Sequence, residues 1–151
     1  MILIDSNSLI VLLLGLMNPS LINSHSKTSI YEEEDFYNLL GAIKNIETLV
    51  VLPNIWTEVD NLLNRFSGSN KDLYVSKIID TIKSTSEKYL KSRLVENRNS
   101  FYDLGLTDTL ILEHAQCCEM LITSDSALAD YAKAYGIKVY DMKELKNESL
   151  K

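Results

Sequence analysis

Hydrophobic positions along the chain follow two alternating patterns. Short continuous apolar runs, which are typical of buried strands, occur at residues 1–4, 48–54, 120–123 and 136–140. Between these runs, apolar residues recur every three or four positions, as they do in amphipathic helices. This spacing predicts helices over residues 6–16, 31–45, 54–66, 71–94, 107–119 and 126–134, with a last short turn at 142–147. Two polar stretches, 20–30 and 67–70, are predicted to be irregular.

Short apolar strands that alternate with amphipathic helices are typical of a parallel sheet with both faces covered. We therefore predict an α/β fold, in which residues 1–151 form a single three-layer α/β/α domain with a central parallel sheet of four to five strands. The long helix 71–94 should contribute six apolar residues to the core: Val75, Ile78, Ile79, Ile82, Tyr89 and Leu90.

Composition and charge restrict the class of protein. The net charge of the 151 residues is −6, so the molecule as a whole does not attract nucleic acid, although a local basic patch or a bound cation can reverse the sign at a site. The two cysteines, Cys117 and Cys118, are adjacent, which suits a reducing cytoplasm better than a disulfide framework. The first charge is negative, and the apolar run 9–17 is far shorter than the ~20 residues that span a bilayer. We therefore expect no export signal, no membrane segment and a cytoplasmic location.

Four acidic residues lie where the predicted strands end or the following helices begin. Asp5 follows the first strand, Glu58 lies early in the helix after the second, Asp108 opens a helix, and Asp125 follows the strand 120–123. In parallel sheets, ligands gather at the carboxyl ends of the strands. Each acid alone is explained equally well as a helix cap, a turn residue or a solvated side chain. Four carboxylates in one cleft would repel each other unless a divalent cation neutralised them, and oxygen ligands without histidine favour Mg²⁺ or Mn²⁺ over zinc.

Four short motifs around these acids resemble those of PIN-domain nucleases. "LIDSNSLI" resembles the opening strand of that family with its Asp, "WTEV" its helical Glu, "TDTLILEHA" its third motif, and "LITSD" its closing strand with Thr-x-Asp. The motifs occur in the family's order over residues 1–125. Two departures are the Ser at position 6, where Thr is commoner, and the segment 67–104, which carries no motif.

The resemblance implies a Mg²⁺- or Mn²⁺-dependent endoribonuclease, with a catalytic and metal-binding site made of Asp5, Glu58, Asp108 and Asp125. Asp5 and Asp108 would bind the metal directly, and Glu58 and Asp125 would bind it or orient the attacking water. Three supporting residues would donate or accept hydrogen bonds beside this site: Ser6, Asn7 and Thr123. Other acids near these motifs are Asp60, Asp103, Glu113 and Asp130, of which Asp130 is the strongest candidate for a fifth member.

The same resemblance implies biological partners. The substrate would be RNA, and the size of the chain resembles toxin ribonucleases of toxin–antitoxin pairs (VapC-like), which bind an antitoxin protein and often form homodimers. The alternative from a different class is a catalytically inactive PIN-like module that binds RNA or a protein. A phosphoacceptor receiver domain would also gather acids at strand ends, but it needs an acidic neighbour for Asp5, which is absent.

Three further features have a structural and a functional interpretation. The stretch 71–98 is net positive and is either a solvated helix face or a surface that holds the RNA backbone. Trp56 either packs in the core or stacks on a base. His114, Cys117 and Cys118 have helical spacing, but buried thiols are commoner in a core helix than metal ligands.

Overall fold

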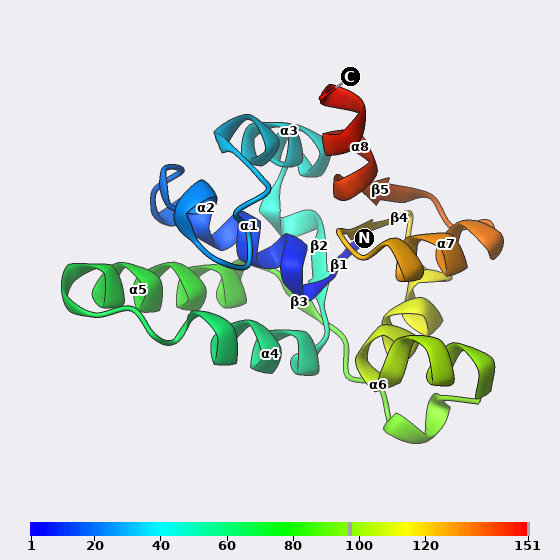
Figure 1. Cartoon of the computed structure of the whole chain (residues 1–151). Coiled ribbons are helices and arrows are strands. Elements are labelled where there is room, and N and C mark those ends of the chain that lie inside the picture. The colour runs from blue at the N-terminus through cyan, green and yellow to red at the C-terminus, as the bar shows by residue number, and fades with distance from the viewer. Residues whose placement is uncertain (97, 151) are drawn as a thin grey trace.

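Five short parallel strands form one sheet at the centre of the computed structural model, which describes residues 1–96 and 98–150 (Figure 1). The spatial order of the strands is β3–β2–β1–β4–β5, and each neighbouring pair is parallel. The strands are β1 (Ile2–Ile4), β2 (Leu49–Val51), β3 (Ser86–Glu87), β4 (Met120–Thr123) and β5 (Val139–Asp141). All strands run in the same direction, but the order in which they are added switches at β1. The strands β2 and β3 are added on one side of β1, and β4 and β5 on the other. The crevice at such a switch, beyond the carboxyl ends of the strands, is where open α/β sheets bind ligands.

Helices cover both faces of this sheet. They are α1 (Ser6–Met17), α2 (Leu21–Ser24), α3 (Glu33–Ile43), α4 (Pro53–Leu63), α5 (Gly68–Ser84), α6 (Arg98–Ala115), α7 (Ser126–Ala134) and α8 (Met142–Ser149), with 3₁₀ turns η1 (Ile46–Thr48) and η2 (Ser92–Leu94). In Figure 1, α1, α4 and α5 lie together on the left of the sheet and α6 and α7 on the right. The predicted three-layer α/β/α architecture with a parallel sheet is confirmed.

Helix α1 is the centre of the core. All its residues except Asn7 and Leu16 are buried, which is expected for a helix that is apolar on every side. It contacts α2, α3, α4 and α5. Gly15 lies directly against the ring of Phe36 in α3, where a Cβ atom would come within 2.1 Å of the ring carbon Cδ1. The position of α1 fixes the position of Asp5, the residue between β1 and this helix.

The prediction of one long helix over 71–94 is wrong. Helix α5 begins earlier, at Gly68, so the predicted loop 67–70 is mostly helical, and it ends at Ser84. Residues 86 and 87 instead pair with β2, and the Lys88 backbone N–H donates to the Val51 carbonyl at 3.2 Å. Of the six residues expected in the core, only Ile78 is buried; Val75, Ile79 and Ile82 are 39–45% exposed and Tyr89 is 72% exposed.

Other boundaries also differ from the sequence-based expectations. The irregular stretch 20–30 contains α2, and α4 ends at Leu63 rather than at residue 66. Helix α6 begins at residue 98, nine residues before the predicted start, and is interrupted at Gly105, whose φ of 81° lies outside the helical region. None of the helices in residues 1–96 and 98–150 combines the length and the apolarity needed to cross a membrane.

Candidate active site

Asp5 lies at the end of β1, at the switch point of the sheet, and is 4% exposed. Its Oδ1 accepts a hydrogen bond from the Ser8 backbone N–H at 2.9 Å, so the side chain caps α1. Its Oδ2 accepts a short hydrogen bond from the Thr123 hydroxyl and one from the Ser124 backbone N–H at 3.2 Å. Burial raises the pKa of Asp5 above its usual value, and these hydrogen bonds lower it in part. The bonds join the ends of β1 and β4 across the switch point.

Asp125 lies two residues after the end of β4 and extends this hydrogen-bond network. Its backbone N–H donates to the Thr123 hydroxyl oxygen at 3.0 Å, and its Oδ1 accepts from the Leu128 backbone N–H at 3.0 Å, which caps α7. Asp5 and Asp125 are therefore helix caps, as the structural interpretation of each predicts. A carboxylate that caps a helix with one oxygen keeps further lone pairs for another ligand, so a cap and a ligand are compatible roles.

Asp108 lies three residues after Gly105, where α6 resumes, and its side chain is half-buried. Burial and, after it, the negative charges of Asp125, Asp5 and Glu58 together raise its pKa to about 7. The structure thus brings the other three predicted acids close enough to act on Asp108, although the four come from separate segments of the chain. Glu58 is the exposed member, on the second turn of α4.

In the part of the chain that the structure describes, no cationic group forms an ion pair with these four acids. Within residues 1–96 and 98–150, the ion pairs of Lys and the N-terminus go to other carboxylates, on Glu32, Asp35, Glu119, Asp141 and Glu144. Two of the nearby acids have structural roles, because the hydroxyl of Tyr74 donates to Asp60 at 2.6 Å and that of Tyr131 donates to Asp103. Asp130 is exposed on α7 and is not among the charges that raise the pKa of Asp108. Among the described residues, no ion pair therefore compensates the negative charge of the four site acids.

The carboxylate oxygens of these acids suit a hard cation, but their arrangement limits how many of them can bind one ion. Carboxylate oxygens are the ligands that Mg²⁺ and Mn²⁺ prefer. Among the described residues, however, no three His, Cys, Asp or Glu side chains are arranged to hold one ion together. Mg²⁺ in phosphoryl-transfer sites commonly takes only one or two carboxylates and completes its shell with water and substrate phosphate, so a pair of these acids is a sufficient protein contribution.

The predicted supporting residues divide into two groups. Thr123 is fully buried and bridges Asp5 and Asp125 with one hydroxyl. Ser6 is buried at the first position of α1, whereas Asn7 is exposed on it. Trp56 is 8% exposed in the hydrophobic core, which confirms the packing interpretation and leaves no free face for a base.

Sequence reasoning missed two pairs of residues at this site. The hydroxyls of Tyr31 and Ser124 are buried and lack a partner at hydrogen-bonding distance within the described residues, yet Ser124 is near enough to lower the pKa of Tyr31. Burial and the charge of Asp5 outweigh this effect and raise the pKa of Tyr31 to about 12. The second pair joins two helices, because the Asn54 side-chain amide of α4 donates to the Thr107 hydroxyl of α6 at 3.2 Å. Asn54 lies one turn before Glu58, and Thr107 precedes Asp108, so this bond fixes the relative position of two site acids.

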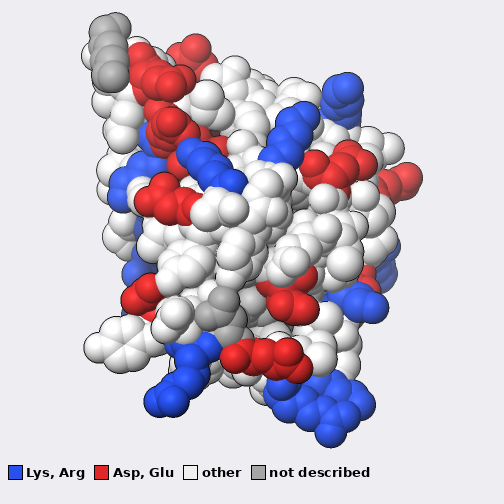
Figure 2. Space-filling model, turned by 90° about the vertical axis from the view of Figure 1, so that its right-hand side faces the viewer, with Lys and Arg blue, Asp and Glu red and all other residues white. Residues whose placement is uncertain are grey.

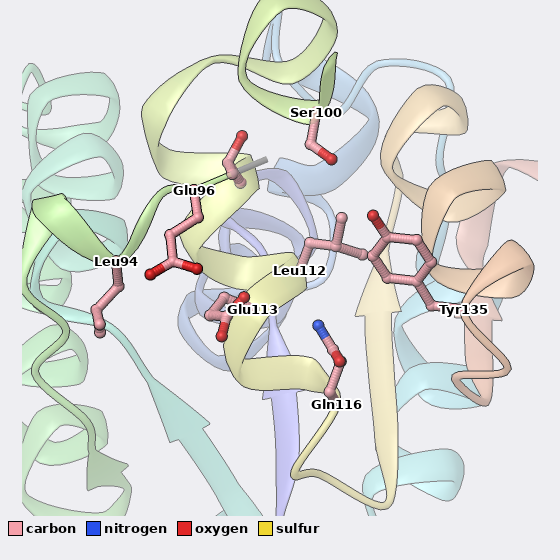
Figure 3. Close-up of a pocket in the computed structure, with 8 residues that line it drawn as sticks. Leu94, Glu96, Ser100, Leu112, Glu113, Gln116 and Tyr135 are labelled. Atoms are coloured by element: carbon pink, nitrogen blue, oxygen red, sulfur yellow. The ribbon is translucent and has the colours of Figure 1, made fainter. Parts of the chain in front are cut away.

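A separate hollow of about 420 Å³ lies between η2, α6 and the end of α7 (Figure 3). Glu96, from the loop before α6, and Glu113, from α6 itself, lie on one side of it and Tyr135 lies on the other, with Leu112 between them. None of the four site acids lines this hollow, so it is distinct from the switch-point site. Across the face that carries α6 and α7, acidic and basic side chains are interspersed, and basic side chains gather at its lower end (Figure 2).

Comparison with protein-family models and with curated proteins finds no match to this chain.

Proposed function

We propose that this protein is a Mg²⁺- or Mn²⁺-dependent endoribonuclease. The observation that carries the proposal is the effect of three of these acids on the fourth. Asp108 has a pKa of about 7 because it is half-buried near Asp125, Asp5 and Glu58, which have no cationic partner in the described residues. A carboxyl whose pKa is raised by burial and by neighbouring carboxylates in a ligand-binding crevice is characteristic of a functional site. The four motifs that resemble those of PIN-domain nucleases contain these same acids.

In this proposal the acids have different roles. Asp5 is held rigidly by three hydrogen bonds, and Asp108 is the acid whose pKa the charges of the other three raise, so these two would bind the ion. Glu58 is exposed and Asp125 is half-buried, so these would meet the solvent side and orient the water that attacks the phosphodiester. The ion, when bound, would supply a more acidic water and neutralise charge on the phosphate. Thr123 would hold Asp5 and Asp125 in fixed relative positions through its hydroxyl.

Cleavage of RNA with a matched set of variants tests the proposal. Purified protein is incubated with total RNA in Mg²⁺, in Mn²⁺ and in EDTA, and the cut positions are mapped. We expect metal-dependent cleavage by the wild type, loss of at least a hundredfold in Asp5→Asn and Asp108→Asn, and normal cleavage by Asp80→Asn, an exposed acid on α5. Full activity in either site variant, with an unchanged fold by circular dichroism, refutes the assignment.

We propose a toxin of a toxin–antitoxin pair as the biological setting, on the strength of the family resemblance and the chain length. Expression of the wild type should arrest growth of a bacterial host, and Asp108→Asn should not. Relief of the arrest by a small adjacent open reading frame with a DNA-binding pattern would support this setting. Growth that is equal for both forms would contradict it.

A catalytically inactive PIN-like module that binds RNA or protein is the second candidate. It is favoured by one observation, that no three carboxylates of the described residues are arranged around a common ion position. Wild-type protein that binds RNA but leaves it intact in both metals would identify this candidate as correct.

A further inference from the structure

A pocket of about 290 Å³ lies beside the acid site, between the start of α4, the loop after β3 and the resumption of α6. Its lining includes four apolar side chains, Pro53, Leu90, Leu106 and Leu110, together with Thr57 and Tyr89. This volume is at the lower end of the roughly 300–1,000 Å³ of small-molecule sites, so it suits a flat group of the size of one nucleobase.

Two residues connect this pocket to the acids. Asn54 lines the pocket and donates to Thr107, the residue before Asp108. Thr57 lines it and is the residue before Glu58. The pocket therefore lies on the same two helices, α4 and α6, that carry Glu58 and Asp108, which suits a nucleotide next to a phosphodiester held at the acid site.

Tyr89 gives the pocket an accessible aromatic face. It is 72% exposed although it is a large side chain, and no ring partner within the described residues covers it. Aromatic side chains of this kind bind single-stranded nucleic acid by stacking on bases, a contact that duplex RNA cannot offer. The single Trp does not provide such a face, because it is buried.

The loop that carries Tyr89 is basic. Lys88, Lys91, Arg93 and Arg98 are exposed, against two acids, Glu87 and Glu96, in the same segment. The Lys88 backbone N–H bonds to the carbonyl at the carboxyl end of β2, which places the start of this loop at the sheet edge where the acids lie. In a protein of net charge −6, this local excess of positive charge is complementary to a phosphate backbone.

We propose that this pocket binds one base of single-stranded RNA, stacked on Tyr89, while Lys88, Lys91 and Arg93 contact the adjoining phosphates. The proposal rests on the endoribonuclease function above and specifies its substrate as unpaired RNA. It assigns the contact with phosphate to Lys88, Lys91 and Arg93, after β3, rather than to the whole stretch 71–98, because half of that stretch belongs to helix α5, which ends at Ser84.

Binding without cleavage tests the pocket. Fluorescence anisotropy in EDTA measures the affinity of the full chain for labelled single-stranded RNA of about ten nucleotides and for a duplex of the same length. We expect the single strand to bind more tightly, Tyr89→Ala to lose at least about fivefold in affinity for it, and Tyr89→Phe to stay within about twofold of the wild type. Tyr102→Ala is the matched control, since Tyr102 is 90% exposed on α6 and does not line the pocket.

Four results would overturn the proposal: wild-type affinity in Tyr89→Ala, an equal loss in Tyr102→Ala, equal affinity for duplex and single strand, or no binding of either RNA by the wild type. Because Tyr89 is exposed, we expect its variants to fold normally. Thermal unfolding of each variant checks this. Failure here and failure of the nuclease function are distinguishable. Metal-dependent cleavage with binding that does not depend on Tyr89 refutes only the pocket, whereas Tyr89-dependent binding with no cleavage in Mn²⁺ refutes only the nuclease.

Discussion

Among single residues, Asp108 is the most perturbed acid of the proposed site. A free Asp titrates near pH 3.9, whereas in the folded protein its pKa is about 7. The folded state therefore holds the proton more tightly than the unfolded state does. Stability is greatest below the unfolded pKa and falls as the pH rises from about 4 to about 7.

The first prediction follows from that sign. In EDTA, the wild type should lose on the order of 2 kcal/mol of unfolding free energy between pH 4.5 and pH 7.5, less than the full pKa difference gives because the site is partly solvated. Asp108→Asn removes the ionisation, so its stability should change less over this range and exceed that of the wild type at pH 7.5. Urea unfolding across the range measures both. Parallel pH profiles would show that Asp108 ionises normally.

Thr123 joins two site acids through one hydroxyl, which donates to Asp5 and accepts from the backbone N–H of Asp125. Thr123→Val keeps the shape and removes both bonds, which leaves a buried carboxylate oxygen and a backbone N–H with fewer partners. We expect a loss of about 1–3 kcal/mol in unfolding free energy, and recovery of most of it in Thr123→Ser, which restores the hydroxyl. Denaturant unfolding of the three proteins is the measurement. A loss in the Ser variant with none in the Val variant would point to the methyl group instead.

The four acids could be singled out because each lies at a strand end or early in a predicted helix, and the resemblance to PIN-domain motifs implied Thr123. Tyr31 could not be predicted, because it opens a predicted helix without any motif and its proximity to Asp5 depends on tertiary packing. The Asn54–Thr107 bond was equally inaccessible, since the two residues are 53 positions apart and no local pattern relates them. Local patterns identify the residues at strand ends, whereas contacts between segments depend on the tertiary packing.

At the scale of elements, the close approach of α1 and α3 depends on Gly15. Gly15→Ala would place its Cβ within 2.1 Å of a ring carbon of Phe36, so one of the two helices must shift. We expect a loss of about 1–3 kcal/mol, the usual cost of overpacking a core, in spite of the better helix propensity of Ala. Gly41→Ala in α3 is the control, because no atom lies within 4 Å of its Cβ position, and it should stabilise the protein by up to ~1 kcal/mol.

Adding Phe36→Leu to Gly15→Ala should recover part of the loss, because the smaller side chain relieves the clash. Thermal or urea unfolding of the two single variants and the double variant measures the coupling between the positions. Additive effects of the two substitutions would mean that the helices do not meet at these residues.

The error at helix α5 shows what periodicity does not contain. Residues 71–94 include no Gly or Pro, and their apolar positions continue at helical spacing past residue 84. The helix stops because the open edge of β2 offers backbone partners, which residues 86–88 take. Competition between a helix and a sheet edge is a tertiary effect, so β3 could not be predicted from the local pattern. Val75, Ile79 and Ile82 also follow the helical pattern, but they are exposed because α5 buries Tyr74, Ile78 and Thr81 instead.

At the scale of the whole molecule, the strand order decides which segments share the site. In the order β3–β2–β1–β4–β5, β1 and β4 are neighbours although they are more than a hundred residues apart. This order differs from the 2-1-3-4-5 arrangement of flavodoxin-like sheets, to which receiver domains belong, and so argues against that alternative on the basis of fold. The acids after β1 and β4 meet those from α4 and α6 only in this topology.

The last prediction concerns the response of the folded molecule to metal. An ion that binds the native site stabilises the whole fold by about 2.7 kcal/mol at a concentration a hundredfold above its dissociation constant, or roughly 2–4 °C per kcal/mol in a chain of this size. The melting temperature of the wild type should therefore rise with Mn²⁺ at pH 7.5, and that of Asp80→Asn should rise equally. Asp108→Asn should begin at a higher melting temperature without metal and show little response to it, because the substitution removes both the repulsion and the ligand. Repulsion between the acids alone predicts that Asp108→Asn has the higher melting temperature without metal. Only a bound ion predicts that Mn²⁺ raises the melting temperature of the wild type and not that of Asp108→Asn.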